Sequence, residues 1–317
     1  MAKTNVKTSD ALVSSNGLEK EVPTTRLEVL KTYKIYIGGQ FPRTESGRFY
    51  SPENSAGEKL ANVCLSSRKD FRDAVLAARG AIGGWAGRAA SNRGQILYRM
   101  AEMLEGRKSQ FIDELIRQDK QPLEATREVD LSIDRLIYYS GWCDKFQQIF
   151  SSVNPVGSSH FNFSVAEPMG VVAMIAPQTD SLLGLVSLIA PVIAGGNTCV
   201  VLAAETKPLC AVTFAEVLNS SDLPGGVVNI LTGKLKELAP FFADHMDVNA
   251  TIYCENDTTI QQLIALKGTD NLKRVFFYNG IDWYSDGGQS PYFILDTQEI
   301  KTTWHPIENI AGSGGGY

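Results

Sequence analysis

The sequence, 317 residues long, has no excess of positive charge and no long apolar segment. Its 30 Lys and Arg are outnumbered by 35 Asp and Glu, which gives a net charge of −5. A chain of this charge offers no basic surface to nucleic acid or to an anionic membrane. The most apolar segment, residues 182–194, is too short to cross a bilayer and is interrupted by Pro191. We therefore expect neither a nucleic-acid partner nor a membrane partner.

Cysteine and histidine are scarce. The five cysteines are widely spaced and form no C-x-x-C pair, which predicts neither a disulfide framework nor a zinc site. Reduced thiols are typical of a cytoplasmic protein, and we expect that location here. The three histidines have no metal-binding spacing, so we expect no metal.

Three motifs that bind phosphate groups or present a nucleophile are also missing. The chain contains no G-x-G-x-x-G dinucleotide fingerprint, no Walker A loop and no G-x-S-x-G sequence. Dinucleotide binding would therefore have to rest on other residues.

The N-terminal half changes its pattern twice. Residues 1–30 are polar and unpatterned, which predicts a flexible leader. Within residues 31–149 apolar side chains recur at helical spacing, for example at Phe71 and Val75, and we expect helices with some strand. Residues 150–167 alternate polar and apolar side chains behind a turn signal, which predicts a β-hairpin.

The C-terminal half alternates short apolar runs with helical segments over residues 168–300. Runs that are apolar on both faces and separated by helices are typical of a parallel sheet covered on both sides. We therefore expect an α/β fold, a Rossmann-like doubly wound parallel sheet with flanking helices, from which the 150–167 hairpin protrudes. Ligands of such sheets sit at the carboxyl ends of the strands. Residues 301–317 end in AGSGGGY and predict a flexible tail. The apolar runs are 170–176, 198–202, 227–231, 251–254 and 274–277.

Several of these segments resemble, in order, motifs of the NAD(P)-dependent aldehyde dehydrogenase superfamily. They are EPMGVVAMIAPQTDSLLG from residue 167, LPGGVVNILTG from residue 223 and NLKRV from residue 271. The resemblance extends over roughly residues 33–300 and covers the coenzyme-binding half of the family.

This resemblance implies a domain plan. Residues 31–149 would be the helical and strand-containing N-terminal part of a coenzyme-type domain, and residues 168–300 its Rossmann-like core. Residues 150–167 would be the oligomerisation hairpin, and the catalytic domain would be absent beyond the 301–317 tail.

Few coenzyme-binding positions carry over. The strand end Ile175-Ala176-Pro177 matches the family, and Glu205 matches the Glu of a Lys-x-x-Glu motif that grips the adenosine ribose. Leu202 replaces the Lys of that motif. Without the resemblance, Glu205 is interpreted as a solvent-exposed loop carboxylate.

The pyrophosphate-binding motif of the family, a glycine and hydroxyls at a helix N-terminus, is replaced here. Glu255 and Asp257 bring negative charge to that place, although acidic residues at a helix start are also ordinary caps. The resemblance thus implies that NAD or NADP binds weakly or not at all, through vestigial positions.

The catalytic positions implied by the resemblance are also changed. Thr179 replaces the Asn that stabilises the oxyanion, a loss that typically costs about 10²–10³ in rate. The general base is replaced by Ser285 or by Tyr278, depending on which of two registers is used, with an insertion after Tyr278 in the second. No cysteine follows Ser290, and Cys254 matches a Thr of the coenzyme motif. We expect no catalytic residue.

Three interpretations of function follow. The first is an aldehyde-dehydrogenase-like pseudoenzyme that serves as a structural or regulatory subunit and assembles with itself, or with an active aldehyde dehydrogenase, through the 150–167 hairpin. The second is a module that binds NAD(P) or an adenine nucleotide weakly. The third, an active aldehyde oxidoreductase, is opposed by the replacement of the thiol, the base and the oxyanion donor.

Overall fold

A five-stranded parallel sheet organises residues 29–307, the part of the chain that this computed structural model describes. The strand order is β10-β9-β6-β7-β8, and the chain reverses its direction of travel across the sheet between β6 and β9. The predicted doubly wound parallel sheet is therefore confirmed. The strands are β6 (Val171–Ile175), β7 (Thr198–Leu202), β8 (Val228–Leu231), β9 (Ala250–Tyr253) and β10 (Arg274–Phe277).

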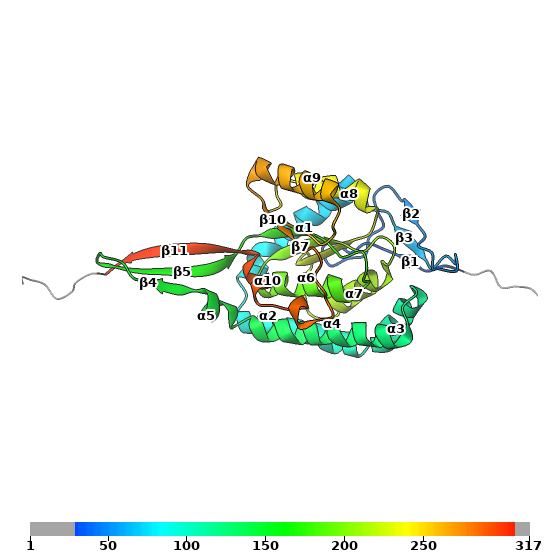
Figure 1. Cartoon of the computed structure of the whole chain (residues 1–317), viewed down its shortest axis with the longest axis horizontal. Helices are drawn as coiled ribbons and strands as arrows, with labels where there is room; N and C mark the ends of the chain where they lie inside the picture. The colour runs from blue at the N-terminus through cyan, green and yellow to red at the C-terminus, as the bar shows by residue number, and fades with distance from the viewer. Residues whose placement is uncertain (1–28, 308–317) are drawn as a thin grey trace, which may run out of the picture. The chain divides into compact units, whose positions relative to one another are not determined.

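Helices cover both faces of this sheet (Figure 1). Alternate residues of β6 face opposite ways, so Val171 and Ala173 join the core under one helical layer while Val172 and Met174 join the other. The first layer holds α1 (Arg68–Ala86), α8 (Leu235–Asp244) and α9 (Thr258–Gly268). The second holds α2 (Ala90–Glu105), α3 (Lys108–Arg117), α4 (Pro122–Trp142), α6 (Leu183–Ala194) and α7 (Leu209–Asn219).

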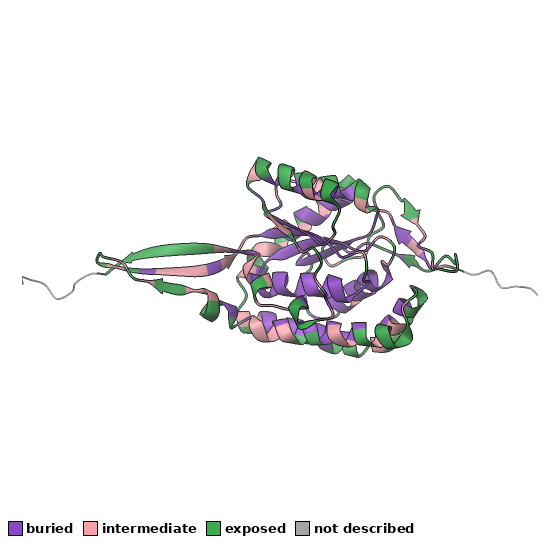
Figure 2. Cartoon of the chain, viewed as in Figure 1, coloured by how far each residue is buried: buried purple, intermediate pink, exposed green. Residues whose placement is uncertain are grey.

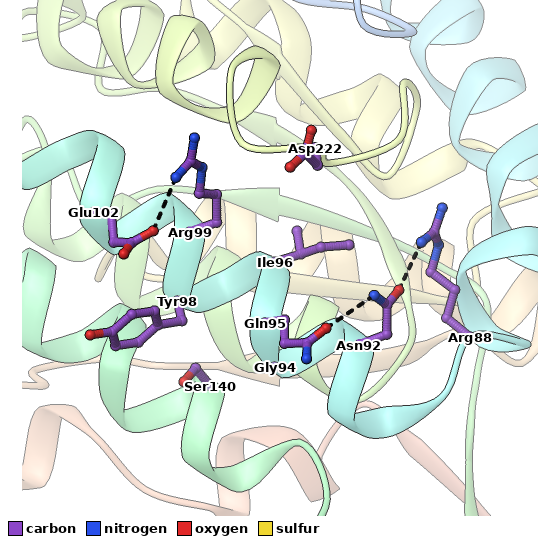
Figure 3. Close-up of a pocket in the computed structure, with 10 residues that line it drawn as sticks. All are labelled: Arg88, Asn92, Gly94, Gln95, Ile96, Tyr98, Arg99, Glu102, Ser140 and Asp222. Carbon is purple, nitrogen blue, oxygen red and sulfur yellow. Dashed lines mark hydrogen bonds and ion pairs between the residues drawn. The ribbon is translucent and has the colours of Figure 1, made fainter.

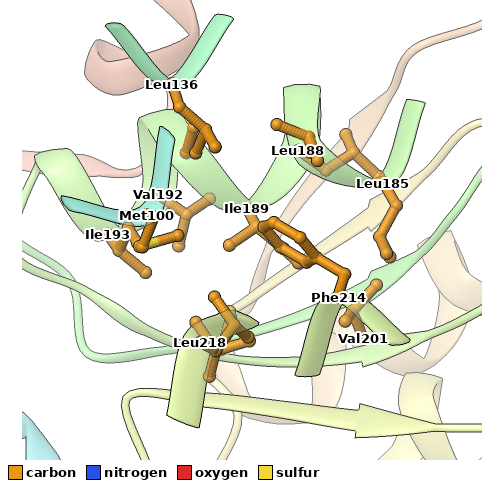
Figure 4. Close-up of a cluster of buried hydrophobic side chains, with 14 of the residues drawn as sticks. Met100, Leu136, Leu185, Leu188, Ile189, Val192, Ile193, Val201, Phe214 and Leu218 are labelled. Atoms are coloured by element: carbon orange, nitrogen blue, oxygen red, sulfur yellow. The ribbon is translucent and has the colours of Figure 1, made fainter. Parts of the chain in front are cut away.

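The second layer contains the larger core, built around α6. All twelve residues of α6 are buried, because the helix lies between the sheet and the neighbouring helices. Its Leu188 and Ile189 lie in one buried cluster with Leu136 of α4, Phe214 of α7 and Val201 of β7 (Figure 4). Buried side chains are concentrated in the sheet and in α6 (Figure 2).

A small three-stranded sheet of order β1-β3-β2 accompanies the main one. It is formed by β1 (Thr32–Tyr33), β2 (Phe49–Tyr50) and β3 (Asn62–Cys64). The leader expected at residues 1–30 lies outside the described residues except for its last two positions.

A third sheet, which is antiparallel, extends away from the helices and the parallel sheet (Figure 1). The hairpin predicted at 150–167 is present as β4 (Ser152–Asn154) and β5 (His160–Pro168), preceded by the short helix α5 (Phe146–Phe150). A third strand, β11 (Gln298–Pro306), pairs with β5 along its whole length. We call these three strands the extension.

The tail expected at residues 301–317 was wrong for residues 301–306, which form most of β11. The glycines that suggested a tail lie beyond residue 310, whereas 301–306 contain two threonines and a tryptophan, which favour strands and pair with β5. Residues 308–317 lie outside the described part. Between β10 and β11 the chain forms η2 (Asp286–Gly288) and α10 (Tyr292–Leu295), and η1 (Thr269–Asn271) precedes β10.

Across residues 29–307, none of the helices combines the length and the apolar character that a membrane span requires.

Candidate functional site

The carboxyl ends of β6, β9 and β10 surround a pocket of about 370 Å³. Each wall comes from the loop that follows one of these strands, which is where ligands of doubly wound sheets bind. The lining residues are Pro177, Thr179 and Asp180 after β6, Cys254, Glu255 and Asn256 after β9, and Tyr278 with residues 280–284 after β10.

Gln178 ties three strand ends together. Its backbone N–H donates to Glu255 Oε1 at 2.7 Å, and its side-chain amide donates to the carbonyl of Ala176 at 2.9 Å. Its Oε1 accepts from the backbone N–H of Glu205 at 2.8 Å. The strand end Ile175-Ala176-Pro177 is therefore fixed by contacts within the chain. Sequence reasoning did not single out Gln178.

The Glu205 carboxylate contacts the N-terminal end of α8. Its Oε1 accepts from Lys234 Nζ at 2.9 Å and its Oε2 accepts from the N–H of Leu235, the first residue of α8, at 2.9 Å. A carboxylate at a helix N-terminus is stabilised by the free N–H groups and by the helix dipole. Each oxygen of this carboxylate therefore already accepts one hydrogen bond from within the chain. Leu202, at the position of the family's lysine, is fully buried.

The acidic residues at the start of α9 are caps. Asp257 is the N-cap, and its Oδ1 accepts from the N–H groups of Thr259 at 2.9 Å and Ile260 at 3.3 Å. By the resemblance described above, these N–H groups lie at the helix end that would hold the pyrophosphate of the coenzyme. Asp257 thus occupies two of the N–H groups that the resemblance assigns to the pyrophosphate.

Cys254 lines the pocket but is 8% exposed. Burial raises the pKa of its thiol, and the neighbouring Glu255 raises it further. The neutral thiol is therefore the form present near neutral pH, and it is a poor nucleophile.

Tyr278 is the residue after β10. Its N–H donates to the carbonyl of Tyr253 at 2.9 Å, which continues the hydrogen bonding between β10 and β9. Its hydroxyl donates to Asp296 Oδ2 at 2.8 Å, and burial raises the pKa of Asp296. Of the two candidates for the position of the family's general base, Tyr278 thus lies at the end of β10, and Ser285 lies in the loop that follows.

A charged cluster missed by sequence reasoning borders the pocket. Lys120 Nζ lies 2.6 Å from Glu128 Oε2 and 3.4 Å from Asp180 Oδ1. It also donates to the Tyr284 hydroxyl at 2.7 Å. Burial acts to lower the pKa of Lys120, but the hydrogen bonds and charges of Glu128 and Asp180 outweigh it, so the pKa is raised. The four residues come from three distant segments and no local pattern joins them.

A larger hollow of about 720 Å³ lies elsewhere, over α2 (Figure 3). Its polar side chains are paired along the helix surface, Arg88 with Asn92 at 2.8 Å and Arg99 with Glu102 at 3.3 Å. Such neighbours three or four residues apart are ordinary helix-surface contacts. Among residues 29–307, no group of three His, Cys, Asp or Glu side chains is placed to hold a metal ion.

Comparison with known proteins supports the resemblance. The sequence model described as "Aldehyde dehydrogenase family" matches residues 41–309. Retinal dehydrogenase 2 of Gallus gallus is 33% identical over 286 residues, which cover 88% of this chain and 53% of that protein. Mitochondrial 10-formyltetrahydrofolate dehydrogenase of Homo sapiens is 29% identical over 289 residues, 89% of this chain and 30% of that protein.

The fold has counterparts among solved structures. The NAD+ complex structure of aldehyde dehydrogenase from Bacillus cereus superposes with a TM-score of 0.74 at 26% identity, covering 79% of this chain and 51% of that one. The chain thus spans about half the length of these relatives or less. Both the matched sequence and the shared fold lead to one assignment: the chain belongs to the aldehyde dehydrogenase family.

Proposed function

We propose that this chain is a non-catalytic member of the aldehyde dehydrogenase family that serves as a structural or regulatory subunit. It assembles with itself or with an active aldehyde dehydrogenase. The buried, free state of Cys64, Cys143, Cys199, Cys210 and Cys254 is consistent with a reducing compartment and supports a cytoplasmic location.

One observation carries the proposal: the Glu205 carboxylate is bonded to Lys234 and to the start of α8. The one ribose-gripping position that the sequence retains is used to hold the fold together. Two further features support the same conclusion. Thr179 directs its hydroxyl to Asp180 Oδ2 at 3.2 Å, and the thiol of Cys254 is kept neutral by burial.

The extension supports the assembly half of the proposal. Val153 of β4 and Phe161 of β5 are 66% and 45% exposed, and they line an apolar groove together with Phe163 and Val165. Aromatic and branched side chains that remain exposed on a sheet face are typical of surfaces that another chain covers.

The experiment measures hydride transfer and native mass on the same sample. With NAD+ or NADP+ and a panel of aldehydes, we expect no NAD(P)H from the chain alone, while an active aldehyde dehydrogenase serves as the positive control. In light scattering we expect a mass above that of one chain, either alone or mixed with the active enzyme. Turnover by the isolated chain would contradict the proposal. A single-chain mass for the chain alone, together with no mass in the mixture beyond those of the two proteins measured separately, would contradict it as well.

A second candidate function is a module with weak affinity for NAD(P) or an adenine nucleotide. The pocket of about 370 Å³ at the strand ends favours it, and one similar structure is an NAD+ complex. Titration calorimetry with NAD+, NADP+, AMP and ATP at millimolar concentration tests it. A saturable heat supports this function, and the absence of heat for all four removes it.

A further inference from the structure

The loop between β10 and α10 lines the pocket through residues 280–284. The remaining lining residues come mainly from the loops after β6 and β9. In the register that places Tyr278 at the position of the family's general base, this loop contains the insertion that follows Tyr278. We call residues 279–288 the lid.

Two residues hold the lid to the rest of the chain. Trp283 is 4% exposed, and its carbonyl accepts from Arg135 Nη2 of α4 at 3.0 Å. The Tyr284 hydroxyl accepts from Lys120 Nζ and lies 3.0 Å from Glu128 Oε2 and 3.1 Å from Asp180 Oδ1, to one of which it donates. The other residues of the lid, apart from Gly288, are exposed or only partly buried.

The Tyr284 contacts can break without leaving a buried charge unpaired. Lys120 keeps Glu128 and Asp180 as ion-pair partners when the hydroxyl leaves. Glu128 Oε1 also keeps the N–H groups of Leu182 and Leu183. The charged cluster therefore keeps its contacts without Tyr284, and the Tyr284 hydroxyl is the group that connects the lid to the cluster.

A thiol in the same pocket can report on the position of the lid. Cys254 lies in the same pocket as lid residues 280–284 and is 8% exposed. Cys199 and Cys210 are completely buried in the core and do not line this pocket. Movement of the lid alone would uncover Cys254 and leave the other two protected.

We propose that residues 279–288 form a lid, latched by the Tyr284 hydroxyl onto the Lys120–Glu128–Asp180 cluster, that closes the pocket at the carboxyl ends of β6 and β9. Any ligand of this pocket enters only when the latch opens. The inference builds on the proposed non-catalytic role, because it identifies what occupies the approach to the family's coenzyme site. Its test reads a thiol and uses neither coenzyme nor partner, so the two proposals can fail separately.

The experiment follows alkylation of the five cysteines of the full chain by peptide mass spectrometry. In Tyr284→Phe we expect Cys254 to react faster than in the wild type by about tenfold or more, since hydrogen bonds to charged groups are among the stronger ones. A second variant, with residues 281–286 replaced by Gly-Gly, should give at least the same acceleration. Tyr292→Phe is the matched control, because Tyr292 is 63% exposed and lies outside the lid.

The outcomes separate a lid from general loosening. Selective acceleration at Cys254, with Cys199 and Cys210 unchanged, supports the latch. Equal acceleration of all five cysteines in Tyr284→Phe would mean that the hydroxyl stabilises the whole fold, and it overturns the proposal. An unchanged Cys254 rate in both lid variants overturns it as well. Should the shortened variant not fold, Tyr284→Phe alone decides.

Discussion

At the scale of single residues, the Glu205 carboxylate joins the loop after β7 to the start of α8. We predict that Glu205→Gln lowers the free energy of unfolding by about 1 kcal/mol, because it removes a partly buried ion pair and a negative charge at a helix start. Chemical denaturation measures the change. The control is Glu299→Gln, whose ion pair with Arg274 is more exposed and should matter less. Equal losses in the two variants would contradict this role of Glu205.

Lys273 provides a pH dependence of stability. Its Nζ donates to the carbonyls of Ala243 at 2.6 Å and His245 at 3.1 Å, and burial lowers its pKa from 10.5 to about 8. Between these two values the unfolded chain holds a proton that the folded chain has lost, so the Lys273 contribution to stability rises with pH.

The measurement compares wild type with Lys273→Met. We predict that their difference in unfolding free energy shifts in favour of the wild type between about pH 8 and pH 10.5, by at most about 1.4 kcal/mol per pH unit. Both proteins share the buried tyrosines and cysteines, whose side chains ionise in this range when the chain is unfolded, so those contributions cancel. A difference that stays constant with pH would show that Lys273 keeps an ordinary pKa.

At the scale of elements, the extension presents different residues on its two faces. Phe161 and Phe163 are two apart on β5 and share a face with Val153, the partner of Phe163 on β4. We predict that replacing Phe161 and Phe163 with glutamate reduces the assembled mass in analytical ultracentrifugation, without changing the far-UV circular dichroism. The control is Thr302→Glu, because Thr302 lies on the opposite face, opposite Ser164. An unchanged mass in the double variant would exclude this face from the interface.

The elements also show which features a sequence can reveal. Strands β6 and β7 were predicted to within two residues, because a run that is apolar on both faces is a local signal. Strand β11 was missed, since six of its nine residues were assigned to a tail, and its partner β5 precedes it by more than a hundred residues. The Lys120–Tyr284 contact could not be predicted from the sequence for the same reason, because only tertiary packing brings those two segments together. Glu205 was singled out from the sequence, but its bond to α8 depends on where that helix begins.

At the scale of the whole described chain, burial is unevenly distributed. The parallel sheet is enclosed on both faces by helices, and every residue of β6, β7, β8 and β9 is buried. In β11 eight of nine residues are exposed or partly buried, and the extension is mostly green and pink in Figure 2. Segments with few buried contacts open locally at a lower free energy than the core. The extension should therefore be the least protected sheet of an isolated chain.

Assembly should increase the protection of the extension, and hydrogen exchange can detect this increase. If a second chain covers the extension, the backbone amides of the extension exchange more slowly as the protein concentration rises, since binding stabilises only the assembled form. We predict that exchange at residues 298–306 and 160–168 slows with increasing protein concentration over the range in which the native mass increases. Exchange at β6 and β7 should stay constant and serves as the internal reference. If the mass rises while the extension continues to exchange at its dilute-solution rate, the chains meet through another surface.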